Sequence, residues 1–308
     1  MYSLGVIHDA SSAQAQRFGG APTQILGLVE LSQDEFDALQ EANTALGRYR
    51  QQVSFLNLVH WNFEDYIGCQ EKLLIAGIGR SEPALRAPDL DLNRRLMNLL
   101  SAARTFLDHT ETDLKRRFGA DSERYTRFET LTHKLHDSFF SYRFLYEFRN
   151  FVQHCGLPLD SISHTSTHNS RTLSATVSRV RLLRDFGWKA SLRGEIELLP
   201  EEVDITPFLL EHVDQLTTLH KHLCAEELLT LREAAGLVLR RYSEVAQNPG
   251  APCVLTLPDA PTPASELSAM STLTIEHFVL EIAVAEFVRR ECEDTVGARG
   301  GRGEAGNP

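Results

Sequence analysis

The residues whose types and spacing could do chemistry lie in the segment 140–158, which contains Arg149, Asn150 and His154. Arg149 is always charged and can hold a phosphate with a planar set of donors, and the imidazole of His154 can accept and give a proton near neutral pH. Asn150 lies one turn before His154, where its amide can orient the imidazole or a substrate hydroxyl. This set suits metal-free cleavage of RNA: a base activates the ribose 2′-hydroxyl, an acid protonates the leaving oxygen, and the guanidinium stabilises the charge on phosphorus.

A helix must position these residues. At about 100° per residue, one arc of the segment is mostly apolar and wide enough to face a core. Its members are Ser141, Phe144, Leu145, Phe148, Phe151, Val152 and Cys155. The opposite arc carries Arg143, Tyr146, Glu147, Asn150 and His154, with Arg149 and Gln153 at its margin. Gly156 and Pro158 end the helix, whose dipole favours a protonated His154. The residues expected to contact the substrate are Arg143, Tyr146 and Gln153.

The spacing leaves two interpretations open. Arg149 and His154 are about 140° apart around the helix axis, so one copy forms the site only loosely, and two copies across a two-fold axis would complete it. An Arg-x4-His pair is also expected about once by chance in such a chain, and Arg104 with His109 is a second match. In the structural interpretation, Arg149 pairs with a carboxylate or a helix-end carbonyl and His154 caps the helix.

The run FRNFVQH near the end of a long helix resembles the signature of the HEPN superfamily, in which an arginine and a polar residue, often asparagine, precede a histidine by a few positions. The longer string YRFLYEFRNFVQHCGLPL is similar to that of a group of bacterial helical proteins related to HEPN. The clear similarity covers residues 92–158, and Arg149, Asn150 and His154 are the matching positions.

The resemblance implies a helical bundle, usually dimeric, with metal-independent endoribonuclease activity used in toxin–antitoxin or phage-defence systems. The expected partners are therefore single-stranded RNA, a second copy of the chain, and an antitoxin or defence-system protein. No cofactor and no metal are expected, since His220, His222 and Cys224 do not share one helix face. The competing hypothesis is a non-catalytic helical interaction or nucleotide-binding module.

The hydrophobic pattern predicts a mainly α fold, a long antiparallel helical bundle with a small α+β C-terminal part. The predicted parts are an N-terminal lead-in at 1–31, an HEPN-like bundle at 32–158, an α+β appendage at 159–296 and a disordered tail at 297–308. A capping box at Ser32 and Glu35 begins the first helix, and a second ends at Gly119. The third begins near Ser122 and runs to residue 155 as one rod of about 50 Å.

Beyond Pro158 the pattern changes. The segment 161–170 is rich in Ser, Thr and His and predicts a loop, and the alternation at 172–178 predicts a strand, beside which 188–199 could return as a hairpin. Asp204 is expected to cap a helical region that reaches residue 247, and a final helix is predicted at 273–293.

Composition bounds the class of protein. Hydrophobic residues make up 42% of the 308 residues, no stretch has the roughly eighteen uninterrupted apolar residues of a membrane helix, and no signal-peptide pattern is present. We therefore expect a cytoplasmic protein without a membrane partner, whose five scattered cysteines are reduced thiols. The net charge of −11 argues against nucleic acid, but residues 140–194 carry eight basic side chains against three acidic ones. Such a local excess is either an electrostatic footprint or the solvated face of a strand.

Overall fold

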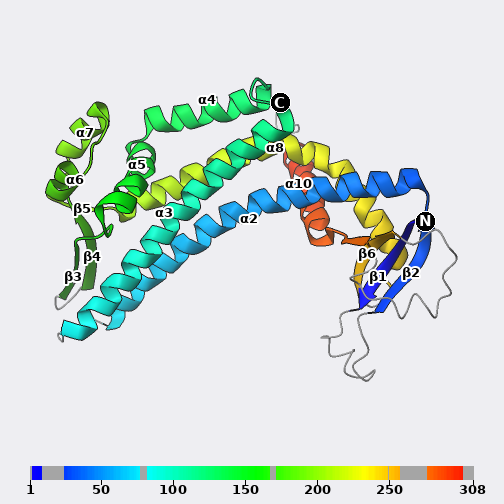
Figure 1. The fold of residues 1–308 in the computed structure, drawn as a ribbon, viewed down its shortest axis with the longest axis horizontal. Coiled ribbons are helices and arrows are strands. Elements are labelled where there is room, and N and C mark those ends of the chain that lie inside the picture. The colour runs from blue at the N-terminus through cyan, green and yellow to red at the C-terminus, as the bar shows by residue number, and fades with distance from the viewer. Residues whose placement is uncertain are drawn as a thin grey trace, which may run out of the picture. The chain divides into compact units, whose positions relative to one another are not determined.

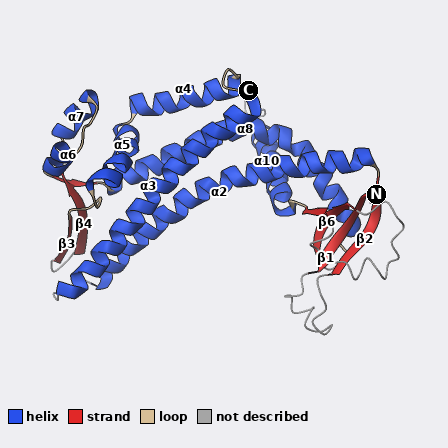
Figure 2. Ribbon diagram, viewed as in Figure 1, coloured by secondary structure: helices blue, strands red, loops and turns tan. Residues whose placement is uncertain are grey.

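The computed structural model describes residues 2–8, 24–76, 82–166, 171–248, 250–256 and 276–300 (Figure 1). Helices predominate among them, as Figure 2 shows, which confirms the predicted mainly α class. The chain divides into two compact units, one formed by residues 1–51 and 224–308 and the other by residues 52–223. The long helices α2 (Gln33–Ala76) and α8 (Thr206–Val245) contribute residues to both units.

The unit 52–223 is built on long helices. Besides parts of α2 and α8, it contains α3 (Glu82–Phe118), α4 (Glu123–Ser138) and α5 (Phe140–Cys155). Gln52, early in this unit, donates a hydrogen bond to Asp113 near the end of α3, whereas Cys69 contacts Asp91 near its start. An earlier residue of α2 thus contacts the end of α3 and a later one contacts its start, so α2 and α3 run in opposite directions.

The predicted rod from residue 121 to 155 is two helices, so this prediction is wrong. Phe139 has extended backbone angles (φ −124°, ψ 121°) and separates α4 from α5. The break frees carbonyl groups at the end of α4, and Nη1 of Arg143 donates to the carbonyl of His136 at 3.0 Å. The same guanidinium pairs with Glu195, its Nε lying 2.7 Å from Oε2. A long-range ion pair and a carbonyl cap thus stabilise a junction that contains neither Gly nor Pro.

The apolar arc of α5 lies in the core as predicted. Phe144, Phe148 and Phe151 are fully buried, and the rings of Phe144 and Phe151 stack on Trp188 with centroid distances of 5.8 and 6.0 Å. Burying each aromatic side chain contributes about 1.5–3 kcal/mol. These contacts fix the rotation of α5 about its axis, and therefore the direction in which its polar arc points.

A three-stranded antiparallel sheet with the order β3-β4-β5 follows α5. Its strands are β3 (Ser161–Ser166), β4 (Arg171–Ser178) and β5 (Glu202–Asp204), and the helices α6 (Arg179–Asp185) and α7 (Ala190–Glu197) lie between β4 and β5 in the chain. The strand predicted at 172–178 is confirmed. The loop prediction is wrong at 161–166, and residues 167–170 lie outside the described part.

The predicted returning hairpin at 188–199 is also wrong. Leu192 and Ile196 lie four residues apart and are both buried, which is the spacing of a helix face, and α7 forms there. The neighbours of β4 are β3 and β5 instead. The cap at Asp204 is confirmed, since its Oδ1 accepts a hydrogen bond from the Thr206 N–H at 2.9 Å.

The unit 1–51 with 224–308 contains a four-stranded antiparallel sheet with the order β2-β1-β6-β7. The strands are β1 (Tyr2–His8), β2 (Gln24–Leu31), β6 (Ala251–Thr256) and β7 (Glu276–Val279), followed by α10 (Ile282–Gly300). The predicted loose lead-in is therefore wrong over β1, whereas β2 forms where a short strand was expected, near Ile25. The helix predicted from residue 273 begins at Ile282. The predicted disordered tail is helical at 297–300, and 301–308 lie outside the described residues.

Local signals set the start of α2 and the approach of β1 to β6. Ser32 N–H donates to Oε2 of Glu35 at 2.9 Å, and Glu35 N–H donates to Ser32 Oγ at 3.3 Å, which confirms the capping box. Gly250 has φ +126°, and a Cβ there would lie 2.7 Å from the carbonyl oxygen of Ile7. Only glycine fits this close approach of the two strands.

Candidate functional site

Arg149 lies on the solvent margin of α5, and neutral amides hold its guanidinium. Its Nη1 donates to Oε1 of Gln153 and, at 3.4 Å, to Oδ1 of Asn150. Its Nε is buried and has no hydrogen-bond partner among the described residues. The side chain is half-buried, so its apolar stem packs on the protein while the guanidinium end reaches the surface. The guanidinium therefore keeps donor capacity, and no carboxylate of the described part of the chain offsets its charge.

Neighbouring basic side chains are bound differently. Arg143 pairs with Glu195, Arg181 with Asp160, Arg184 with Asp185, Lys189 with Glu147, and Arg193 with Glu197. Arg179 donates to the backbone carbonyls of Glu197 and Leu199. The excess of basic residues at 140–194 is thus largely neutralised, in part by acids that follow it in the sequence. Among the described side chains of this segment, Arg149 and Arg179 have no carboxylate partner, and Arg149 differs from Arg179 because side-chain amides hold its guanidinium and backbone carbonyls do not.

His154 lies in the last turn of α5 and is exposed. It makes no hydrogen bond to any residue that the structure describes. Asn150 does not orient this imidazole: its Nδ2 donates to Oε2 of Glu147 at 3.3 Å, and its Oδ1 accepts from Arg149. Gly156, with φ +115°, ends the helix two residues later. The imidazole is therefore open to a ligand or to a second protein chain.

The three predicted substrate contacts have separate environments. Arg143 joins α4, α5 and α7 through the contacts described above. The ring of Tyr146 lies under the guanidinium of Arg104, 4.4 Å from its centre, and lines a cavity of about 400 Å³ together with His133 and Lys189. Gln153 is exposed and accepts from Arg149. The structure thus brings Arg149, Asn150 and Gln153 together and places Arg143 and Tyr146 in packing contacts.

The second Arg-x4-His match shows what this spacing does in a structural setting. Arg104 pairs with Asp108 at 2.9 Å and covers Tyr146. The ring of His109 stacks on Phe55 with a centroid distance of 4.2 Å. Both members of this pair are occupied by packing and charge compensation, in contrast to Arg149 and His154.

The sequence pattern did not single out the polar residues buried on α8. His212 and Gln215 lie at core positions three residues apart, and both are more than nine-tenths buried. Burial lowers the pKa of His212 to about 4, although the nearby Gln215 amide opposes this shift. No well-formed hydrogen bond joins them, because His212 Nδ1 and Gln215 Oε1 both lack a partner among the residues that the structure describes. The available signal was their position between the apolar residues Leu209, Val213 and Leu216.

Among the described residues, no group of three or more His, Cys, Asp or Glu side chains could hold a metal ion. None of the described helices is long and apolar enough to cross a membrane. Comparison with known protein families, with curated proteins and with solved structures finds no match. Fold and site together define a mainly helical protein with a half-buried arginine that has no carboxylate partner among the described residues and an exposed histidine in the last turn of the same helix.

Proposed function

We propose that this chain is a metal-independent RNA endonuclease of the HEPN type that acts on single-stranded RNA in the cytoplasm, as a toxin or a phage-defence effector. The observation that carries the proposal is the environment of Arg149, whose charge is held by amides and not by a carboxylate. An arginine in this state can exchange a neutral amide for a phosphate oxygen without leaving a buried carboxylate unpaired. The exposed His154 lies five residues further along the same helix.

The chemistry needs a base, an acid and a cation. The imidazole of one His154 takes the proton of the ribose 2′-hydroxyl, whose oxygen then bonds to the adjacent phosphorus. The bond from phosphorus to the 5′-oxygen breaks, and a protonated imidazole gives that oxygen its proton. Arg149 stabilises the additional negative charge on the phosphoryl oxygens. The products are a cyclic phosphate and a 5′-hydroxyl, so no oxidant, metal or water is consumed in this step.

Two imidazoles in different protonation states are supplied most simply by two subunits. A two-fold axis near the end of α5 would bring the Arg149 and His154 side chains of both copies to one cleft. The surface here suits such a contact, because the large apolar side chains of Leu157 and Val180 are 45% and 53% exposed. Arg181, next to Val180, donates to the Leu157 carbonyl at 2.7 Å, which keeps the two segments together.

The test is incubation of the purified full chain with single-stranded RNA in EDTA. We expect cleavage by the wild type and a loss of about a hundredfold or more in Arg149→Ala and His154→Ala. Exposed residues of the same types elsewhere, Arg116→Ala and His222→Ala, are the matched controls and should cleave like the wild type. Cleavage that survives both substitutions in α5 would show that this site is not responsible.

A non-catalytic binding module is the second candidate, and one observation favours it. Neither the cavity beside Tyr146 nor the groove between α4 and α8 is lined by Arg149 or His154. A module would bind RNA, a nucleotide or a partner protein such as an antitoxin, without cleaving RNA in EDTA. Binding that depends on Arg149 while the RNA stays intact would establish this alternative and refute the nuclease.

A further inference from the structure

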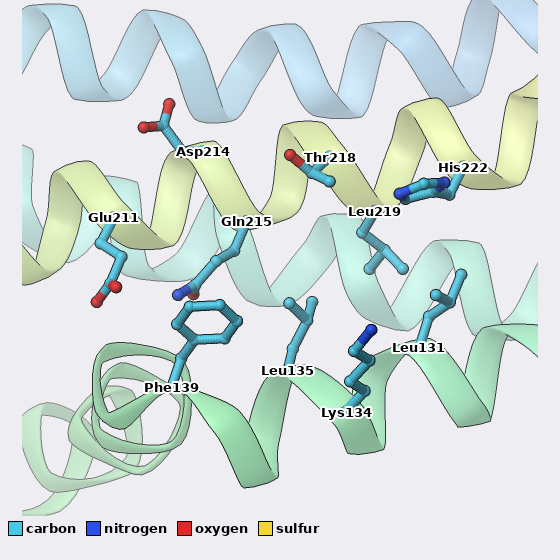
Figure 3. Close-up of a pocket in the computed structure, with 10 residues that line it drawn as sticks. All are labelled: Leu131, Lys134, Leu135, Phe139, Glu211, Asp214, Gln215, Thr218, Leu219 and His222. Atoms are coloured by element: carbon cyan, nitrogen blue, oxygen red, sulfur yellow. The ribbon is translucent and has the colours of Figure 1, made fainter.

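A groove of about 380 Å³ lies between α4 and α8, inside the unit 52–223 (Figure 3). Leu131, Leu135 and Phe139 line it from α4, and Leu219 extends toward them from α8. Its volume is in the range of small-molecule sites, which are typically apolar with a few oriented polar groups. The break at Phe139 contributes to it, because the extended backbone there leaves this aromatic side chain at the junction, more than one-third exposed.

One polar group in this groove lacks a partner. Gln215 is 6% exposed, and its amide Nε2 donates a hydrogen bond to Ser141 Oγ at 3.0 Å, but its Oε1 accepts none from the residues that the structure describes. Figure 3 shows the Gln215 side chain extending from α8 toward the Phe139 ring. A buried carbonyl oxygen without a donor is unfavourable, and a ligand N–H would satisfy it.

The charges are unevenly placed along the groove. Its charged lining residues are Lys134, Glu211 and Asp214, and His222 is the titratable one. In Figure 3, Glu211 and Asp214 both lie at the Gln215 end of the groove, with Asp214 extending to the opposite side of α8 from Gln215, whereas Lys134 and His222 lie toward the other end. Neither carboxylate has an ion-pair partner among the described residues. The end of the groove that holds the unpaired acceptor is therefore also its acidic end.

We propose that this groove binds a small cationic amphiphile, an aromatic or aliphatic body that carries a protonated amine. The body would lie among Leu131, Leu135, Phe139 and Leu219, and the ammonium group would donate to Gln215 Oε1 near Glu211. A carboxylate on the same body would meet Glu211 and Asp214 and be repelled. The site is separate from Arg149 and His154, so its occupancy does not depend on the proposed nuclease.

The probes are tryptamine and indole-3-acetate, which share an indole body and differ in the sign of charge. By calorimetric titration of the full chain, we expect tryptamine to bind and indole-3-acetate to bind at least about tenfold more weakly. Leucine methyl signals in NMR spectra should shift for Leu131, Leu135 and Leu219 with tryptamine. Failure of tryptamine to saturate the protein at millimolar concentration, or equal affinity for both probes, would overturn the proposal.

Two variants locate the site. Glu211→Gln should weaken tryptamine binding about two- to fivefold, because an exposed carboxylate contributes a modest attraction. Gln215→Leu should weaken it further by removing the acceptor, and Glu211→Gln decides the matter if Gln215→Leu does not fold. The matched control is Glu64→Gln, an exposed carboxylate on α2 away from the groove. Equal losses in Glu211→Gln and Glu64→Gln would mean non-specific attraction and would refute the assignment.

Discussion

At the scale of single residues, the arginines of this chain differ in what offsets their charge. Arg104 and Arg149 have the same relation to a histidine in sequence, yet Arg104 pairs with a carboxylate and covers an aromatic ring. Arg149 is held by Gln153 and Asn150, whose amides carry no net charge. A phosphate competes easily with an amide and poorly with a carboxylate already in place. The Arg-x4-His spacing is the same in the two pairs, but their environments differ, and only that of Arg149 leaves its charge available to a phosphate.

Replacing Arg149 by lysine separates charge from shape. Lysine keeps the positive charge but loses the planar fork of donors. We expect Arg149→Lys to bind single-stranded RNA within a few-fold of the wild type but to cleave it at least about tenfold more slowly. Filter binding with a non-cleavable 2′-deoxy strand gives the affinity, and single-turnover cleavage gives the rate. Full cleavage by the lysine variant would show that charge alone suffices at this position.

His212 makes stability depend on pH. Its folded-state pKa of about 4 is below the ordinary value of 6.5, because burial beneath Tyr142 disfavours the charged ring. The unfolded chain therefore binds the proton first, and stability that is complete above pH 6.5 is lost as pH falls toward 4, by up to about 1.4 kcal/mol per pH unit. His212→Leu should lose less stability over this window in urea unfolding. The pKa of His220 is likewise lowered to about 4, so the free energy of unfolding keeps some dependence on pH in both the wild type and the variant. If the free energy of unfolding fell with pH in parallel in the wild type and in His212→Leu, His212 would not be the source of the pH dependence.

At the scale of elements, the junction of α4 and α5 decides where the candidate site points. Helix α5 carries the site on one face and the aromatic core on the other, and its direction changes at Phe139. Arg143 connects three helices at this junction: it belongs to α5, donates to the His136 carbonyl of α4, and pairs with Glu195 of α7. A residue first expected to touch substrate thus stabilises the element that presents the site.

Removing Arg143 should weaken the junction measurably. Arg143→Gln leaves the His136 carbonyl and Glu195 without their donor, and we expect a loss of about 1–3 kcal/mol in the free energy of unfolding. Arg94→Gln breaks an exposed pair with Asp91 within α3 and should cost at most about 0.5 kcal/mol. Urea denaturation followed by circular dichroism compares the two. Equal, small losses would mean that packing alone holds the junction.

At the scale of the whole molecule, residues far apart in the chain build one sheet. Strand β1 pairs with β6, so that Tyr2 faces Thr256 and Ile7 faces Ala251. The close approach at Gly250 permits this pairing. Folding of the unit that contains both chain ends therefore depends on closing a very long loop, whose entropic cost the sheet and its core must offset.

Gly250→Ala tests that dependence. A methyl group would meet the Ile7 carbonyl at 2.7 Å, in a backbone conformation that alanine adopts only with strain, and we expect a loss of about 2–3 kcal/mol. Hydrogen exchange should show the loss in β1 and β6. Gly194→Ala, in α7 with open space around its Cα, should instead be neutral or stabilise by up to about 1 kcal/mol. Unchanged protection of β1 in Gly250→Ala would contradict the close approach.

The proposed two-fold assembly also belongs to this scale. Leu157→Asp places a charge on the surface next to His154 and should abolish both the dimer and RNA cleavage. Leu198→Asp is the control, since Leu198 is 86% exposed at the end of α7. Light scattering gives the mass of each variant, and the EDTA assay gives its activity. A monomeric wild type that cleaves RNA would refute the shared site.

The sequence alone determined the features that depend on nearby residues. The capping box at Ser32, the caps at Ser122 and Asp204, and the apolar arc of α5 each depend on side chains and backbone within a few residues. These signals were sufficient for the mainly helical class, for the starts of three helices and for the face of α5 that meets the core.

Only the tertiary structure decided the rest. Of the two strands that pair with β1, β6 lies almost the whole chain away, and the junction at Phe139 carries an ion pair between Arg143 and Glu195 that no local pattern predicts. The state of Arg149 is decided in the same way, because whether a carboxylate reaches an arginine depends on which distant segments fold beside it. Periodicity reports which face of a helix is apolar, but only the packed chain shows which charges on the other face remain uncompensated.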